Sequence, residues 1–559
     1  MKALVASSPI RYGLAADRGS GLRAFFKRWL TGWRIAAFLV SLITLVPLAV
    51  VLSSFLTPQS DIWMHLAKHV LPGLLLNTFW LALGVALGTG ILGVALAWLT
   101  AACDFPGRRF FSWALMLPMA VPAYVIAFVT IGLLDFTGPV QGSLRTWFGS
   151  SAWFPAIRSR GGVIVVMTLA LYPYVYLLAR NAFLTQGKRA LEAGQSLGLN
   201  RRQGFIQIAL PMARPWIAAG IMLALMETLA DFGTVAVFNY DTFTTAIYKA
   251  WFGMFSLSAA SQLASILVLM VLLLALAEQA WRGDRRYHAP GRSNQSRYRL
   301  SPTARWAASI FAGVVLAAAF IVPVGQLALW CVQTAAQDFD ERYPMFVWHS
   351  VLLSAMAAGL VVLAALILSY VLRRHQDRPT WFFTRLSTLG YAIPGTVLAV
   401  GIFIPVAWLD NQLIGLLQEW LGIHQGALLR GTLTVMLLAY VARFLAPGFN
   451  AVDSAMQRIT RNQEEAARGM GLTGWRLFGN VHLPLLRGGI VSAALLVFVD
   501  VMKEMPITLM TRPFGWDTLS VRIFEMTSEG QWERAALPAI ALVLIGLIPV
   551  ILLTRQSEQ

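Results

Sequence analysis

Long apolar blocks alternate with short polar segments along almost the whole chain. About 20 residues of α-helix cross the roughly 30 Å hydrocarbon core of a membrane, and about twelve blocks reach that length. They lie at residues 35–56, 78–102, 110–134, 161–179, 214–237, 258–280, 306–332, 346–372, 382–408, 427–447, 487–511 and 535–554. The pattern therefore predicts an all-α, polytopic membrane protein with about 12 transmembrane helices.

Composition and charge agree with this prediction. Of the 559 residues, 57% are hydrophobic and 13% are charged, whereas charged residues make up about 25% of a soluble domain. The net charge of +18 is concentrated in alternate loops, and residues 409–426 contain no Lys or Arg. This distribution favours an orientation signal over nucleic-acid binding and predicts that both termini are cytoplasmic. We expect an uncleaved first span, and the two cysteines suggest neither a disulfide framework nor a metal cluster.

The second half of the chain repeats the first. The apolar stretch that begins at Asn77 parallels the one at His349, 272 residues later, and the stretch at Arg214 parallels the one at Arg487, 273 residues later. A near-constant offset indicates a duplication. About six spans per half is an even number, which gives a parallel repeat in which both halves have the same orientation. We predict a cytoplasmic N-terminal segment (1–34), a first half (35–280), a cytoplasmic linker (281–305) and a second half (306–559).

Each half carries one copy of the same polar segment, "EAGQSLGLNRRQGFIQIALP" and "EAARGMGLTGWRLFGNVHLP". The key positions are Glu192, Ala193, Gly198, Ile208 and Pro211 in the first copy and Glu465, Ala466, Ala467, Gly471, Val481 and Pro484 in the second. A helix that ends at the glycine needs a left-handed residue there, and the proline suits the first turn of the next helix. The spacing predicts a bent helical elbow in the cytoplasm, over residues 187–212 and again over 455–485.

These segments resemble the Glu-Ala-Ala loop of ABC importer permeases. That pattern is Glu-Ala-Ala, three residues, Gly, nine residues, Ile, two residues, Pro; here Gly194 replaces the second alanine of the first copy, and Val481 replaces isoleucine in the second. Nearly the whole chain resembles the fused, double-length permeases of the ferric-iron importer family. The resemblance implies a transport subunit of the bacterial inner membrane, without enzymatic activity or a cofactor of its own. It also implies two copies of a cytoplasmic ABC ATPase that use ATP and dock on the elbows, where the motif glutamate anchors the loop, and a periplasmic binding protein that delivers the substrate.

The lack of a phosphate-binding motif in this sequence agrees with a separate ATPase. The phosphate-binding pattern Gly-x-x-x-x-Gly-Lys-Ser/Thr is missing from the sequence, so this chain is not expected to cradle ATP. Gly469, Gly471 and Gly474 spell Gly-x-Gly-x-x-Gly. A dinucleotide site requires that motif between a strand and a helix, whereas here it follows a predicted helix in a loop. We therefore predict no dinucleotide site.

Four acidic residues lie in the apolar segments that follow the two elbows. Glu227 and Asp231 are four residues apart, as are Asp500 and Glu504, and this spacing places each pair on one helix face. Ionisable residues inside a membrane normally face a cavity or a partner, and carboxylate oxygens suit hard cations. We predict that both pairs line a translocation pathway for a cation such as ferric iron. Alternatively, they pair internally, with Lys503 or with neighbouring helices, and only shape the gate.

Asp61, His65 and His69 share one helix face on the predicted outer side of the membrane. They are candidate metal ligands, but an amphipathic interfacial helix explains them as well, and we favour that interpretation. We predict no certain metal site and no catalytic site.

Two other functions remain open. A permease for thiamine, which is also cationic, or for another small solute fits the same architecture; phosphonates are less expected beside four acids, though Lys503 leaves room for them. An ion-coupled secondary transporter also has two parallel halves, and the acids would then relay protons. The duplicated elbow argues against this second class.

Overall fold

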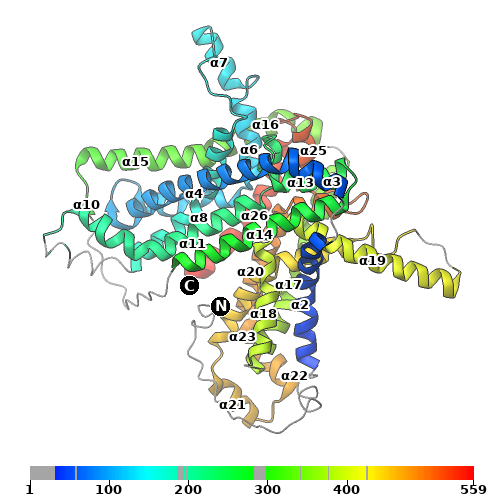
Figure 1. The fold of residues 1–559 in the computed structure, drawn as a ribbon. Helices are drawn as coiled ribbons and strands as arrows, with labels where there is room; N and C mark the ends of the chain where they lie inside the picture. Colours follow the sequence, from blue (N-terminus) through cyan, green and yellow to red (C-terminus); the bar gives the residue numbers. More distant parts are fainter. Residues whose placement is uncertain are drawn as a thin grey trace. The chain divides into compact units, whose positions relative to one another are not determined.

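The computed structural model describes residues 32–56, 60–185, 194, 196, 198–282, 298–339, 341–375, 377–422 and 426–558. These residues are helical almost throughout, and eleven of their helices are long and apolar enough to cross a membrane (Figure 1). The twelfth predicted span coincides with α26 (Ala536–Glu558), whose segment Ala536–Leu547 is a shorter apolar helix. The prediction of an all-α polytopic membrane protein is confirmed.

The chain forms two compact units. Unit 1 contains Met1–Thr57, Pro344–Thr518 and Ile548–Gln559, and unit 2 contains Pro58–Tyr343 and Leu519–Leu547.

The helices of unit 2 belong mainly to the first half of the chain, and some of them are short 3₁₀- or π-helical segments labelled η. In chain order they are α3 (Ser60–His65), η3 (Leu66–Val70), α4 (Leu71–Ala102), α5 (Arg108–Ala114), η4 (Leu117–Ala120), α6 (Ala123–Leu134), α7 (Pro139–Phe148), α8 (Arg160–Thr185), α10 (Arg201–Gly204), η5 (Phe205–Ala209), α11 (Leu210–Ala230), α12 (Gly233–Val237), α13 (Phe243–Tyr248), η6 (Lys249–Gly253), α14 (Leu257–Arg282), α15 (Pro302–Leu316), η7 (Ala317–Ile321), α16 (Val322–Asp338), α25 (Leu519–Ser528) and the first part of α26. Two short strands, β1 (Cys103–Asp104) and β2 (Tyr298–Arg299), pair in parallel.

The helices of unit 1 belong mainly to the second half. They are α2 (Gly32–Ser53), η2 (Ser54–Leu56), α17 (Tyr343–Arg374), α18 (Arg378–Ser387), η8 (Thr388–Ala392), α19 (Gly395–Leu421), α20 (Leu433–Arg458), α21 (Arg461–Gly469), α22 (Gly474–Leu477), η9 (Phe478–His482), α23 (Leu483–Lys503) and α24 (Pro506–Thr511).

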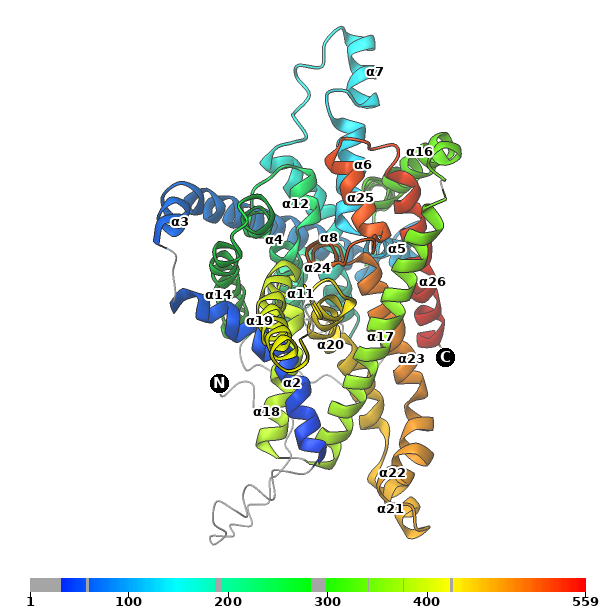
Figure 2. The same ribbon diagram turned by 90° about the vertical axis from the view of Figure 1, so that its right-hand side faces the viewer.

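The first helix of each half packs in the unit built mainly from the other half. In unit 1, α2 runs beside α18 (Figures 1 and 2). Arg34 forms an ion pair with Asp377, and Thr44 Oγ1 donates to the carbonyl of Ser387 over 3.2 Å. The two compact units therefore differ from the two sequence halves by an exchange of helices.

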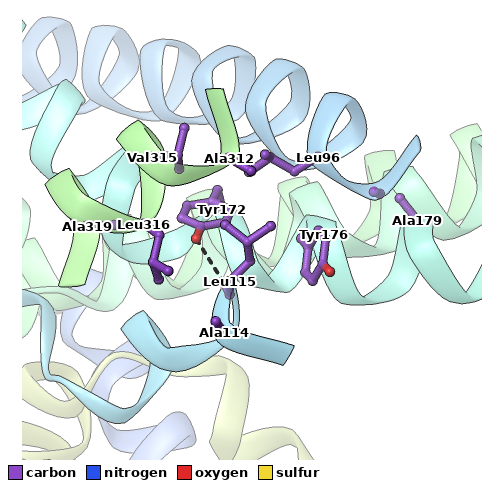
Figure 3. Packing of buried hydrophobic residues seen from close by; sticks show 11 residues of the cluster. Leu96, Ala114, Leu115, Tyr172, Tyr176, Ala179, Ala312, Val315, Leu316 and Ala319 are labelled. Atoms are coloured by element: carbon purple, nitrogen blue, oxygen red, sulfur yellow. Dashed lines mark hydrogen bonds between the residues drawn. The ribbon is translucent and has the colours of Figure 1, made fainter. Parts of the chain in front are cut away.

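The reciprocal contact lies in the core of unit 2. Figure 3 shows Ala312, Val315 and Leu316 of α15 beside Tyr172 of α8. The buried Tyr172 hydroxyl donates to the carbonyl of Leu115 over 2.8 Å, so its polar atom is satisfied in an apolar environment.

Two predicted spans, 110–134 and 382–408, are each broken rather than continuous. The first consists of α5, η4 and α6, and the second consists of α18, η8 and the beginning of α19. The breaks fall before Pro122 and Pro394, because a residue that precedes proline is pushed out of the helical region. Val121 and Ile393 are accordingly extended, with ψ of 128° and 129°.

Candidate coupling and translocation sites

The second elbow is a complete helix–turn–helix that lies at the end of α20 (Figure 2). Thr460 and Gln463 form a capping box at the start of α21. At its end, Gly471 has φ of +84°, and the Leu472 amide donates to the carbonyl of Ala467 over 3.1 Å. This is the glycine-terminated helix end that the sequence predicts. Ala467 is buried, whereas Ala466 is exposed.

The first elbow repeats this turn. Gly198 has φ of +87°, and the Leu199 amide donates to the carbonyl of Gly194 over 3.0 Å. Glu192 and Ala193 lie outside the described residues. The two turns therefore have the same backbone geometry.

Pro211 and Pro484 lie in the first turn of α11 and of α23, as the spacing predicts, and each of these helices continues directly from a preceding helical turn. Residues 202–230 and 474–503 are each one helical span, and Pro211 and Pro484 follow the π-helical turns η5 and η9. A proline removes one backbone donor from the preceding turn, and a π-helical turn is one way for a helix to absorb such an irregularity.

Glu464, which precedes the motif glutamate, anchors the second elbow. Its Oε1 accepts from Arg373 Nε over 3.0 Å and lies 3.2 Å from His482 Nε2. Arg373 at the end of α17 also donates to the carbonyl of Ile459 over 2.8 Å. Glu464 is 9% exposed, whereas Glu465 is exposed. Sequence reasoning missed this cluster, because Arg373 and Glu464 are 91 residues apart, and it assigned the anchor to the motif glutamate, Glu465.

The first elbow has no such charged cluster at the corresponding positions. Arg373 and His482 correspond to Ala101 and Ala209, which are both buried, and Glu464 corresponds to Leu191, which lies outside the described residues. Both elbows nevertheless share an aromatic contact: the ring centroids of Trp98 and Phe205 lie 4.6 Å apart.

In the second elbow, the equivalent rings of Tyr370 and Phe478 lie 5.0 Å apart. The same aromatic contact therefore supports an apolar environment in the first elbow and an ionic one in the second.

The two departures from the family pattern are explained by packing. A Cβ atom on Gly194 would clash with Cδ1 of Ile208. In the second copy the corresponding residues are the larger Ala467 and the smaller Val481. We infer that the summed side-chain volume of this pair of residues is similar in the two elbows.

This inference predicts the effect of a single methyl group. Gly194→Ala should destabilise the first elbow by about 1 kcal/mol, because overpacking costs about 1–3 kcal/mol and the terminal methyl of Ile208 is able to move. The rate of tryptic cleavage after the exposed Arg202 should rise. Adding Ile208→Val should restore the slow cleavage; a double variant that is cleaved as fast as Gly194→Ala would contradict the inference.

In each predicted acidic pair, the first acid lies in the last turn of a helix and the second lies just after that helix ends. Glu227 lies in the last turn of α11 and Asp500 in the last turn of α23, and both are half-buried. Asp231 ends α11, and its Oδ1 accepts from the amides of Thr234 over 2.8 Å and Val235 over 3.2 Å. Its Oδ2 accepts from the hydroxyl of Thr234 over 2.9 Å. Asp231 thereby caps α12.

Glu504 caps α24 in the same way. It follows α23, and its Oε1 accepts from the Ile507 amide over 3.2 Å. Glu504 is also paired with Arg443 of α20, with 3.7 Å between Oε2 and Nε. Asp231 and Glu504 therefore each stabilise the start of the next helix. That the two pairs line one pathway stays a prediction.

The candidate histidine ligands lie at the end of α3 and in η3. The exposed rings of His65 and His69 lie 5.1 Å apart, and the side chain of Asp61 lies outside the described part of the chain. Among the described residues, there is no group of three or more His, Cys, Asp or Glu that could hold a metal ion.

Comparison with known proteins gives two matches to one family. The sequence model for "Binding-protein-dependent transport system inner membrane component" matches residues 90–278 and 361–558, one match in each half. The chain is 29% identical over 493 residues to an Fe(3+)-transport system permease protein FbpB 2 of Haemophilus influenzae, which covers 87% of this chain and 90% of the relative.

Two further relatives are more distant. A ferric transport system permease protein FbpB of Actinobacillus pleuropneumoniae is 24% identical over 412 residues, covering 70% of this chain and 57% of the relative. A putative 2-aminoethylphosphonate transport system permease protein PhnV of Salmonella typhimurium is 28% identical over 277 residues, covering 46% of this chain and 97% of the relative.

Proposed function

Because the chain belongs to the family of binding-protein-dependent transport system inner membrane components, we propose that it is the fused permease subunit of an ATP-driven importer of ferric iron. The observation that carries this proposal is the duplicated elbow, which occurs once in each family match. A relative named for Fe(3+) transport, similar over most of both chains, supports iron as the substrate. The predicted acidic pairs also suit a hard cation.

The partners follow from the same proposal. Two copies of a cytoplasmic ABC ATPase would hydrolyse ATP, one docked on each elbow, and a periplasmic binding protein would deliver the substrate. The termini and both elbows would lie in the cytoplasm of a bacterium, and the chain would need no cofactor of its own.

The second elbow offers an exposed surface for such an ATPase. Met470 is 75% exposed and Trp475 is 69% exposed, and Glu465 lies on the same short segment. Behind this surface, the contact between Glu464 and Arg373 joins α21 to α17. Motion of the docked ATPase would then be passed to a membrane helix through a buried ion pair.

Uptake measurements test the proposal. Radioactive ferric iron and labelled thiamine are supplied to cells that lack the protein and then to cells restored with wild type, Gly198→Pro/Gly471→Pro or Glu227→Gln/Asp500→Asn. We expect wild type alone to restore iron uptake fully. The elbow variant should fail because proline cannot adopt positive φ. The carboxylate variant should be impaired while its amount in the membrane is unchanged.

Other outcomes would redirect the proposal. Return of thiamine uptake alone would preserve the architecture and overturn iron as the substrate. Normal transport by the elbow variant would overturn coupling through the elbows and favour an ion-coupled carrier.

A further inference from the structure

We propose that Arg443 is a positioning residue that neutralises Glu504, so that the negative charge available to a cation comes from Asp231 of the first half and not from its repeat partner. This inference rests on the proposed function, because it concerns the cation pathway of that importer. It replaces four equivalent acids with an asymmetric set.

Arg443 is buried in unit 1, and its guanidinium contacts both Glu504 and the carbonyl of Ile393. Its side chain is 9% exposed, and that of Glu504 is 8% exposed. Besides its 3.7 Å contact with Glu504 Oε2, the guanidinium donates through Nη1 to the carbonyl of Ile393 over 2.7 Å. Ile393 is the extended residue at the break before α19. Arg443 therefore connects the beginning of α19 to the end of α23.

Glu504 is held by several groups at once. Its Oε1 caps α24 through the Ile507 amide, and its carbonyl accepts from the Thr508 hydroxyl over 2.8 Å. Thr508 is in turn hydrogen-bonded to the buried Tyr440 hydroxyl of α20. The carboxylate itself accepts from the Ile507 amide and faces the buried guanidinium of Arg443, so its negative charge is already balanced.

The backbone around Glu504 is shaped to receive the longer acid. A Cβ atom on Gly395 would lie 2.5 Å from Glu504 Oε1 and 3.1 Å from Pro506 Cγ. In the first half, the corresponding residues are Ala123 and the shorter Asp231. The extra length of glutamate thus occupies space that the missing methyl group of glycine leaves.

The first half has no arginine at the position of Arg443. Helices α8 and α20 are both 26 residues long and begin 273 residues apart, so Arg443 corresponds to Ala170, which is buried. Asp231 accepts its hydrogen bonds from Thr234 and Val235, neither of which supplies a positive charge. Among the described residues, the repeat therefore keeps the capping role in both halves and adds an arginine counter-charge to Glu504.

Conservative substitutions separate charge from structure. Asparagine at 231 and glutamine at 504 each keep the capping oxygen but remove the negative charge. The test measures ferric-iron uptake against concentration in cells, together with the amount of folded protein by size exclusion in detergent. Asp231→Asn should raise the half-saturating concentration roughly tenfold or more, as expected for the loss of a charged contact. Arg443→Met/Glu504→Gln removes the neutral pair as a whole and should change it by less than about twofold.

A double-mutant comparison tests the pair itself. Arg443→Met should strongly reduce the amount of folded protein, because Glu504 would remain buried without its counter-charge. Arg443→Met/Glu504→Gln should recover most of that protein. The inference is overturned if Arg443→Met folds as well as wild type, if the double variant is not recovered, or if the double variant shifts half-saturation as much as Asp231→Asn.

Failure of the proposed function has a different signature. In that case wild type would not restore iron uptake at all, while the amounts of folded protein in the Arg443 and Glu504 variants would still follow the pattern above.

Discussion

Glu464→Ala is expected to destabilise the second elbow by about 3 kcal/mol and to abolish transport, whereas Glu465→Ala should leave stability unchanged. Removing Glu464 leaves the guanidinium of Arg373 largely buried beside His482 without its carboxylate. A hydrogen bond to a charged group contributes about 1.5–3 kcal/mol, and a buried partner left unsatisfied adds to the loss. Glu465 is exposed, so its removal does not leave a buried charge without a counter-charge.

The two adjacent glutamates make a matched pair for this measurement. Thermal unfolding of the purified protein in detergent should distinguish them, with a lower midpoint for Glu464→Ala only. Stimulation of the partner ATPase should fall in both variants if Glu465 contacts that partner. Equal midpoints for the two variants would mean that the ion pair does not stabilise the elbow.

Gly401→Leu is expected to disrupt the packing of α2 against α19. A Cβ atom at Gly401 would lie 2.8 Å from the carbonyl oxygen of Pro47 and 3.0 Å from Cγ2 of Val51. Because the nearest atom is backbone, α2 itself has to move, and overpacking of this kind costs about 1–3 kcal/mol or more. The midpoint of thermal unfolding and the amount of protein in the membrane should both fall.

Gly359→Leu is the control for this variant. Gly359 lies inside the long helix α17, and a Cβ atom there would meet nothing within 4 Å. The same substitution should therefore leave the midpoint unchanged or raise it slightly, since leucine favours the helix more than glycine does. If both variants behave alike, the exchanged helix does not contribute to the stability of unit 1.

Features set by local sequence were predictable. Runs of apolar residues specify membrane helices because the length of a run and its lack of charge are sufficient. Gly198 and Gly471 were predictable as left-handed positions, because a helix commonly ends at one residue with positive φ and glycine adopts that conformation most easily. The broken spans had a visible signal at Pro122 and Pro394, but a hydropathy window averages over a single proline.

Features set by distant partners were not predictable. The surfaces of α2 and α15 are apolar on most sides, so nothing in their sequences specifies which half they pack against. Arg373 and Glu464 are 91 residues apart, and a basic residue at a membrane boundary already has an explanation as an orientation signal. The capping roles of Asp231 and Glu504 depend on where a helix stops, and helix ends are the least predictable part of a span.

The exchange of first helices also determines when unit 1 is able to assemble during translation. Arg34 and its partner Asp377 are separated by 343 residues, and a ribosome adds about 5–20 residues per second. Helix α2 is therefore made roughly 20–70 s before the helix that it packs against. During that interval its buried face is surrounded by lipid or by the insertion machinery, and unit 1 cannot assemble until most of the second half has been translated.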